Sequence, residues 1–166
     1  MFRTINDFIQ DWEVESDAML KILLATTNGA LLQKVYPEGR TLGDIAWHIV
    51  VSLGEMSATS GLNAVTPIED TETPAEIQYI VDNFNKASNN LLDEVIKKWN
   101  DSMLLDDIMM YGEKWKRGFL LESVIRHQIH HRGQMTILMR QAHLKVPGVY
   151  GPSKEEWAQF GMQPAK

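Results

Sequence analysis

Apolar residues recur at three- and four-residue spacing in four separate stretches of the chain, which is the period of a helix with one buried face. The first stretch covers residues 5–23. The second, "TLGDIAWHIVVSLGEMSATSG", opens at Thr41, a residue that suits a helix N-cap, and ends at Gly61, which suits a helix stop. The pattern therefore predicts two amphipathic helices in the first 61 residues.

The third apolar stripe follows the clearest helix-start signal in the sequence. In "TPAEIQYIV", Thr73 can cap exposed amides and Pro74 suits the first helical position. Glu76 would complete a capping box with Thr73. The stripe continues as far as Trp99. We expect a third helix that Thr73 caps.

The fourth stripe covers residues 119–142. The preceding stretch, 101–117, has no clean period and is expected to be a long connection with room for a short hairpin at Gly112. Beyond the fourth helix, Ser153 and Glu156 could cap one short terminal helix. The predicted fold is an all-α four-helix bundle whose long second and third connections leave room for crossovers.

Composition adds limits to this fold. A chain of 166 residues with 23% charged residues fits a single globular domain over residues 1–166. The net charge is -6 and the 16 basic residues are scattered, so a nucleic-acid partner is not expected. No apolar run approaches the roughly 20 residues of a membrane span, and the first 15 residues lack the apolar stretch of a signal peptide. We expect a cytoplasmic protein with no membrane partner.

The chain contains no cysteine, which excludes disulfides, protein thiolate nucleophiles and cysteine-ligated zinc. A metal would have to be held by His, Asp or Glu. Three of the five histidines lie in "RHQIHHRGQ", residues 126–134. With a rotation of about 100° per residue, His127 and His131 fall within about 20° of Leu120, at the centre of the buried stripe. His130 falls about 80° away and is not expected to join them.

Two histidines at positions i and i+4 can direct their imidazoles to one point, as in a helical metal clamp. They can also be two core-edge residues that polar neighbours satisfy. A third histidine on another helix favours the metal site, and His48 lies at the border of the buried stripe of the second helix. Three histidine ligands leave a coordination position open, as in catalytic sites. Zinc, nickel, iron and copper all accept imidazole ligands.

Several enzyme classes do not fit these residues. The zinc-protease motif HExxH needs a glutamate as general base, and Gln128 stands in its place. No GxSxG turn or phosphate-binding glycine loop is present. His143 lies near the end of the fourth helix, where a cation complements the helix dipole. Glu55, two turns beyond His48, could approach the site as a general base.

The segments "GDIAWHIV", "HQIHHRGQ" and "RQAHLKVPGVYG" resemble the DinB family, also described as DinB and YfiT-like metalloenzymes. The resemblance runs from the second helix to the tail. It implies a four-helix bundle with crossovers, frequently a homodimer, and one divalent metal ion, zinc or nickel, bound by His48, His127 and His131. The pattern differs at His143, where a glycine would be expected, which affects a local turn and not the metal site.

Related DinB-like proteins include S-transferases that use bacillithiol or mycothiol, and mycothiol-dependent isomerases. The resemblance thus implies an enzyme whose metal activates a low-molecular-weight thiol and directs it at an electrophilic small molecule. Hydrolysis by a metal-activated water is the nearest chemical alternative. The third alternative is a stress-induced metal-binding or interaction protein without catalytic activity.

Overall fold

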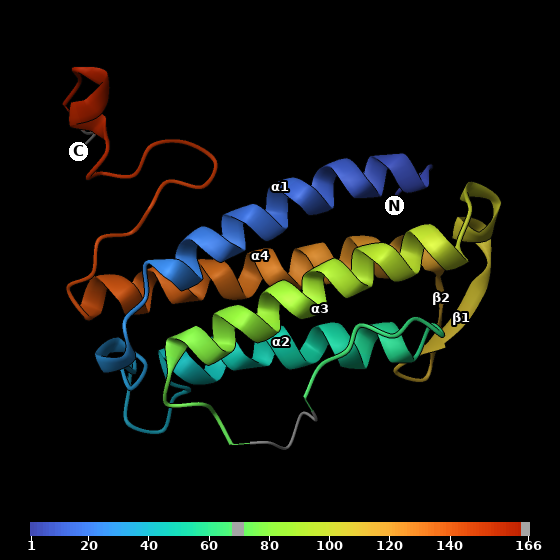
Figure 1. Ribbon diagram of the computed structural model, residues 1–166, viewed down its shortest axis with the longest axis horizontal. Helices are drawn as coiled ribbons and strands as arrows, with labels where there is room; N and C mark the ends of the chain where they lie inside the picture. The colour runs from blue at the N-terminus through green and yellow to red at the C-terminus, as the bar shows by residue number, and fades with distance from the viewer. Residues whose placement is uncertain (68–71, 164–166) are drawn as a thin grey trace.

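Four long helices form the body of the molecule in the computed structural model, which describes residues 1–67 and 72–163 (Figure 1). They are α1 (Ile5–Leu24), α2 (Leu42–Ala58), α3 (Ile77–Lys98) and α4 (Arg117–Gln141). The rest of the regular structure consists of short elements: the 3-10 helices η1 (Asn28–Ala30), η2 (Asp101–Leu105) and η3 (Trp157–Phe160), and the strands β1 (Asp107–Met110) and β2 (Glu113–Lys116). The predicted all-α bundle is confirmed.

The helices form a square in which α1 and α2 lie on one diagonal, because each packs against both α3 and α4. Figure 1 shows that α2 and α3 point in the same direction. The second connection therefore returns along the bundle: Asn63 donates to Glu94 near the end of α3, and Thr73 donates to Asp44 at the start of α2. The second connection is therefore a predicted crossover along the bundle. The third connection joins diagonal helices at one end.

The start of α2 agrees with the sequence pattern. The Thr41 hydroxyl accepts a hydrogen bond from the Asp44 amide at 2.9 Å, and the Asp44 carboxylate accepts one from the Thr41 amide at 2.8 Å. This reciprocal capping box satisfies two amides that the helix itself leaves unpaired. Because it fixes the first turn of α2, it also sets the direction in which His48 points, two turns later.

The predicted start of α3 is wrong. The helix begins at Ile77, and its amide donates to the side-chain oxygen of Asn28 at 2.8 Å. The hydroxyl of Thr73 donates instead to the second oxygen of Asp44, at 2.6 Å. A residue distant in sequence thus supplies the cap of α3, while Thr73 joins the second connection to α2. Local sequence could not reveal either contact.

The second connection lies very close to α2 at one point. A Cβ atom added to Gly54 would lie 1.8 Å from the hydroxyl oxygen of Thr66. No side chain fits there, so glycine permits the connection to pack directly on the helix backbone. The contact lies on α2 at Gly54, six residues after His48.

The third connection contains the hairpin that the sequence left room for. Strands β1 and β2 pair antiparallel, and Tyr111 and Gly112 form the turn with φ of 51° and 81°. Positive φ at both central residues is the signature of a tight hairpin turn that matches the strand twist. The tail forms the expected short terminal helix, η3, and keeps half of the predicted capping box, since the Glu156 carboxylate accepts from the Ser153 amide at 2.9 Å; η3 itself begins after this bond, at Trp157, and has no side-chain cap.

Large apolar side chains from all four helices fill the centre of the bundle, as the four stripes predict. Trp12 on α1 is 1% exposed, and its indole nitrogen donates to the carbonyl of Ser88 on α3 at 3.3 Å. Within residues 1–67 and 72–163, no helix combines the length and apolar character needed to cross a membrane. The core holds α2 and α4 side by side, and the candidate site lies between them.

Candidate metal centre

Three histidine side chains from α2 and α4 meet where these helices pack together. The Nε2 atom of His127 lies 3.1 Å from Nε2 of His48 and 3.1 Å from Nε2 of His131. One nitrogen from each ring lies within 4.8 Å of the other two, so the three histidines could hold a metal ion. The structure therefore brings together the three residues that helical phase selected.

The regular geometry of α4 explains this convergence. His127 and His131 are one helical turn apart, so their rings lie edge to face on one side of the helix with centroids 4.5 Å apart. His130 is exposed, as its phase predicted, and contacts the Gln134 amide at 3.2 Å. His143 lies past the end of α4 with φ of 59°, a left-handed conformation that favours glycine. The expected disturbance at His143 is thus confined to the helix end.

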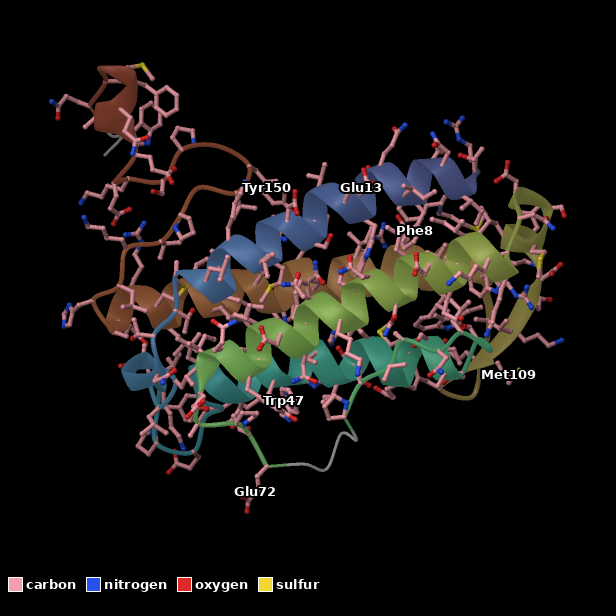
Figure 2. The ribbon with its side chains drawn as sticks, viewed as in Figure 1. Phe8, Glu13, Trp47, Glu72, Met109 and Tyr150 are labelled. Atoms are coloured by element: carbon pink, nitrogen blue, oxygen red, sulfur yellow. The ribbon has the colours of Figure 1, made fainter. Side chains whose placement is uncertain are left out.

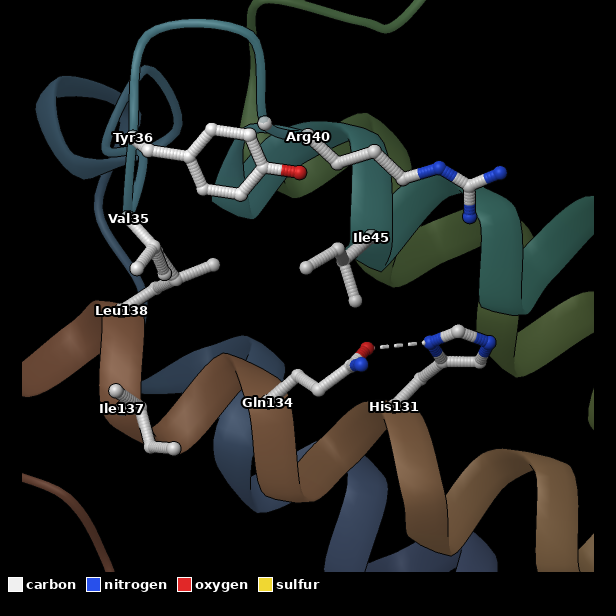
Figure 3. Close-up of a pocket in the computed structure, with 9 residues that line it drawn as sticks. Val35, Tyr36, Arg40, Ile45, His131, Gln134, Ile137 and Leu138 are labelled. Atoms are coloured by element: carbon white, nitrogen blue, oxygen red, sulfur yellow. Dashed lines mark hydrogen bonds between the residues drawn. The ribbon is translucent and has the colours of Figure 1, made fainter.

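Neighbouring polar groups orient two of the three rings. Nδ1 of His131 donates to Oε1 of Gln134 at 2.7 Å (Figure 3), and Nδ1 of His127 faces the hydroxyl of Ser52 at 3.4 Å. The Ser52 hydroxyl itself donates to the Ile49 carbonyl, so its oxygen is free to accept from His127. These contacts favour the tautomers with the proton on Nδ1, in which both rings direct an Nε2 lone pair into the cluster.

This arrangement of lone pairs fits a cation. Nε2 of His127 and Nε2 of His131 face each other at 3.1 Å, although neither carries a hydrogen in this tautomer. Two acceptors at that distance repel each other unless a positive centre lies between them. Ligands that each lie about 2.0–2.1 Å from one zinc ion are themselves about 3 Å apart. The donor set and its spacing therefore suit one divalent ion.

The ionisation of the cluster supports the same conclusion. Burial, together with the neighbouring histidines, lowers the pKa of His127 from 6.5 to about 4. Burial also lowers the pKa of His131, in spite of the opposing hydrogen bond to Gln134. Both imidazoles are neutral at pH 7, and the neutral ring is the form that binds a metal.

One side of the cluster opens into a cavity of about 290 Å³ (Figure 3). Its walls come from the connection between α1 and α2, from α2 itself and from the last three turns of α4; the lining residues are Val35, Tyr36, Gly39, Arg40, Ile45, His131, Gln134, Ile137 and Leu138. Among the described residues, no acidic side chain lines it. A small molecule in this cavity would touch the His131 ring.

Sequence reasoning named the three histidines but missed their surroundings. Ser52 and Gln134 lie four and three residues after His48 and His131, so helical spacing alone could have suggested them. Arg40 and Tyr36 come from an irregular connection, whose course no periodicity reveals. Glu55, the expected general base, is exposed, lies about 10 Å of helix rise beyond His48 and is absent from the cavity lining.

A second polar cluster lies on a neighbouring face of α4, the face toward α1. Arg132 is 3% exposed and donates to the Glu15 carboxylate at 2.6 Å and to the Glu15 carbonyl at 3.1 Å. The Tyr150 hydroxyl donates to the same carboxylate at 2.9 Å, which ties the tail to α1 (Figure 2). Gln128 adds a bond to the Glu15 carbonyl at 3.0 Å. We call these four residues the Glu15 cluster.

The fold and the site define a class of protein: helical bundles in which histidines of two packed helices form an open three-nitrogen cluster. The chain belongs to the DinB family, whose sequence profile matches residues 1–165. It is 43% identical over 166 residues to the uncharacterized protein YrdA of Bacillus subtilis (strain 168), covering 100% of this chain and 99% of that protein.

Solved structures agree with this assignment. A DinB-like protein from Bacillus cereus ATCC 10987 is 36% identical, with a TM-score of 0.87 over 90% of this chain and 100% of the other. The DinB-like protein YjoA of Bacillus subtilis is 14% identical, with a TM-score of 0.65 over 86% of this chain and 97% of the other. The YjoA comparison supports the fold alone.

Proposed function

We propose that this protein is a metal-dependent enzyme that binds one divalent ion, zinc or nickel, through His48, His127 and His131, and transfers a small thiol to an electrophile. The observation that carries the proposal is the pair of opposed Nε2 lone pairs of His127 and His131, 3.1 Å apart beside an open cavity. A metal used only for structure is typically enclosed by four protein ligands, whereas three leave a position open.

The chemistry of the surroundings favours a thiol over a metal-activated water. A divalent ion at this site would hold a thiol sulfur as the thiolate at neutral pH, where a free thiol with a pKa of about 8.5 is mostly protonated. Hydrolysis would also need a base to take a proton from water. The described lining of the cavity offers no carboxylate for that task, and Glu55 lies away from it.

The chain's own residues have two tasks in this proposal. Gln134 and Ser52 fix the histidine tautomers, so that Nε2 of His131 and His127 stays available for the ion. The apolar walls provided by Ile45, Ile137 and Leu138 exclude water from the side on which the substrates meet. Because the chain has no cysteine, the sulfur nucleophile must be a substrate.

The test is the rate of thiol conjugation to monobromobimane, measured with bacillithiol, mycothiol, glutathione and coenzyme A in turn. We expect at least one thiol to react faster with the metal-loaded protein, to fall to the uncatalysed rate after chelation, and to recover when metal is restored. The His130→Ala variant is the matched control and should keep the activity. If no thiol shows metal-dependent acceleration while 4-nitrophenyl acetate is hydrolysed, the thiol-transfer proposal is wrong and metal-assisted hydrolysis replaces it.

A further inference from the structure

The cavity beside His131 has one charged lining residue that the metal site does not use. Arg40 stands at the end of the connection between α1 and α2, is exposed, and forms no hydrogen bond or ion pair with the described part of the chain. Figure 3 shows its side chain extended along the cavity, with the guanidinium on the same side as the His131 ring. An unpaired guanidinium beside a cavity is suited to binding an anionic group.

The rest of the lining is largely apolar. Val35, Ile45, Ile137 and Leu138 contribute aliphatic surface from three different segments. The Tyr36 ring lies over Gly39, where a Cβ atom would approach that ring to 3.0 Å. The cavity volume of about 290 Å³ is near the lower end of the range for ligand pockets, about 300–1,000 Å³. The cavity therefore suits a small molecule with a short apolar body.

The charge of the cavity is opposite to that of the protein. The chain carries a net charge of -6, but the only formally charged side chain in the described lining is Arg40. Low-dielectric walls around a single positive group focus its potential into the cavity. Such a cavity attracts anions, whereas the net negative charge of the protein repels them elsewhere. The cavity is therefore selective for anionic molecules over neutral and cationic ones.

From these observations we infer that the cavity binds a small organic anion, a carboxylate on a short apolar chain, with Arg40 as the residue that determines specificity. This inference concerns the substrate of the proposed reaction. Only the statement that the bound anion is a substrate rests on the proposed function. The carboxylate contacts the guanidinium, and the apolar chain lies against Ile45 and Ile137. The carboxylate end of the molecule then lies on the same side of the cavity as the His131 ring, where the reaction would occur.

The test uses three probes of equal length, hexanoate, hexanamide and hexylamine, in NMR titrations of the full-length metal-free protein. Hydrogen bonds to charged groups are stronger than neutral ones, so we expect hexanoate to bind about five- to tenfold more tightly than hexanamide. Arg40→Gln should remove that difference without changing the affinity for hexanamide. Lys34→Gln is the control, because Lys34 lies on the same connection, donates to the Pro37 carbonyl and does not line the cavity.

Equal binding of hexanoate and hexanamide by the wild-type protein would overturn the inference, as would equal losses of hexanoate affinity in Arg40→Gln and Lys34→Gln. Binding of hexanoate only after metal loading would also overturn it, because the ion and not Arg40 would then hold the carboxylate. Metal content is measured separately by zinc titration, where Arg40→Gln should bind like the wild type. A protein that binds no zinc but prefers hexanoate would contradict the proposed function and leave the Arg40 site supported.

Discussion

Two polar pairs on α4 are offset by a single residue and face different helices. Gln128 and Arg132 face α1, where they contact Glu15. His127 and His131 face α2, where they meet His48. Each pair has i, i+4 spacing, so the same helix geometry presents both, and a rotation of about 100° separates them.

The two clusters differ in how their polar groups are satisfied. In the Glu15 cluster Arg132 donates to the carboxylate and the carbonyl of Glu15, and the carboxylate also accepts from Tyr150, although the buried Oε1 atom of Gln128 has no partner among the described residues. Charge is balanced within the protein. In the histidine cluster, acceptor faces acceptor and neither neutral ring can supply a proton to the other. A buried ion pair with its partners in place is part of the scaffold, whereas two acceptors that face each other, as Nε2 of His127 and Nε2 of His131 do, indicate a ligand site.

The largest effect we expect is on folding, from a change in the Glu15 cluster. Arg132→Met leaves the Glu15 carboxylate buried without its cation, which should lower the free energy of unfolding by about 3–5 kcal/mol. Urea unfolding followed by circular dichroism measures this loss. Zinc stoichiometry in the folded variant should not change. Loss of zinc binding with normal stability would mean that the two clusters are not separate in function.

The complementary change removes a ring of the histidine cluster. His127→Ala deletes the central nitrogen and should weaken zinc binding more than about 100-fold, with little change in the stability of the metal-free protein. His48→Ala and His131→Ala should behave similarly, and His130→Ala should keep most of the affinity. Titration calorimetry on all four variants is the measurement. Equal losses in His130→Ala would contradict the assignment of ligands.

A smaller effect is expected from the residue that orients His131. Gln134→Leu removes the acceptor for Nδ1 but leaves all three rings, so zinc affinity should fall by about 10- to 100-fold without loss of stoichiometry. Thr136→Val, on the same helix, is the control, since its hydroxyl donates only to the Gly133 carbonyl. An affinity for Gln134→Leu equal to that of the control would show that the hydrogen bond does not contribute to metal binding.

The histidine cluster should also make the free energy of unfolding of the metal-free protein depend on pH. The pKa of His127 is about 4 in the folded metal-free protein and near 6.5 when unfolded, so between these values the unfolded chain binds more protons. Stability is therefore complete above pH 6.5 and falls as the pH decreases toward 4. One proton gives a slope of at most about 1.4 kcal/mol per pH unit. Urea unfolding of His127→Gln should show a shallower slope over this range; identical slopes would contradict the shifted pKa.

The parts of the fold and of the candidate site that local helix geometry determines could be predicted from the sequence. The phases of His127 and His131 follow from the regularity of α4, and the N-cap role of Thr41 follows from its residue type at the start of the apolar stripe; the capping box that it forms with Asp44 was not predicted. Contacts between distant segments could not be predicted in this way. Thr73 bonds to Asp44 instead of capping its own helix, because folding brings the two residues together.

The same limit explains what was missed near the site. Arg40 reaches the cavity through an irregular connection, and the partner of Arg132 on α1 is 117 residues away in sequence. Taken alone, Gln128 indicates only that the zinc-protease motif is absent. Its i, i+4 relation to Arg132 repeats that of the histidines, and this repetition could have indicated a second polar face on α4.

The most direct measurement is a long-range ¹H–¹⁵N NMR correlation spectrum of the histidine rings, recorded before and after one equivalent of zinc is added. Zinc should change the Nε2 signals of His48, His127 and His131 to those of a metal-bound nitrogen, while their Nδ1 atoms stay protonated. The rings of His130 and His143 should remain free. Saturation with zinc that leaves the three Nε2 signals unchanged, or that shifts His130 in place of His127, would contradict the three-histidine site.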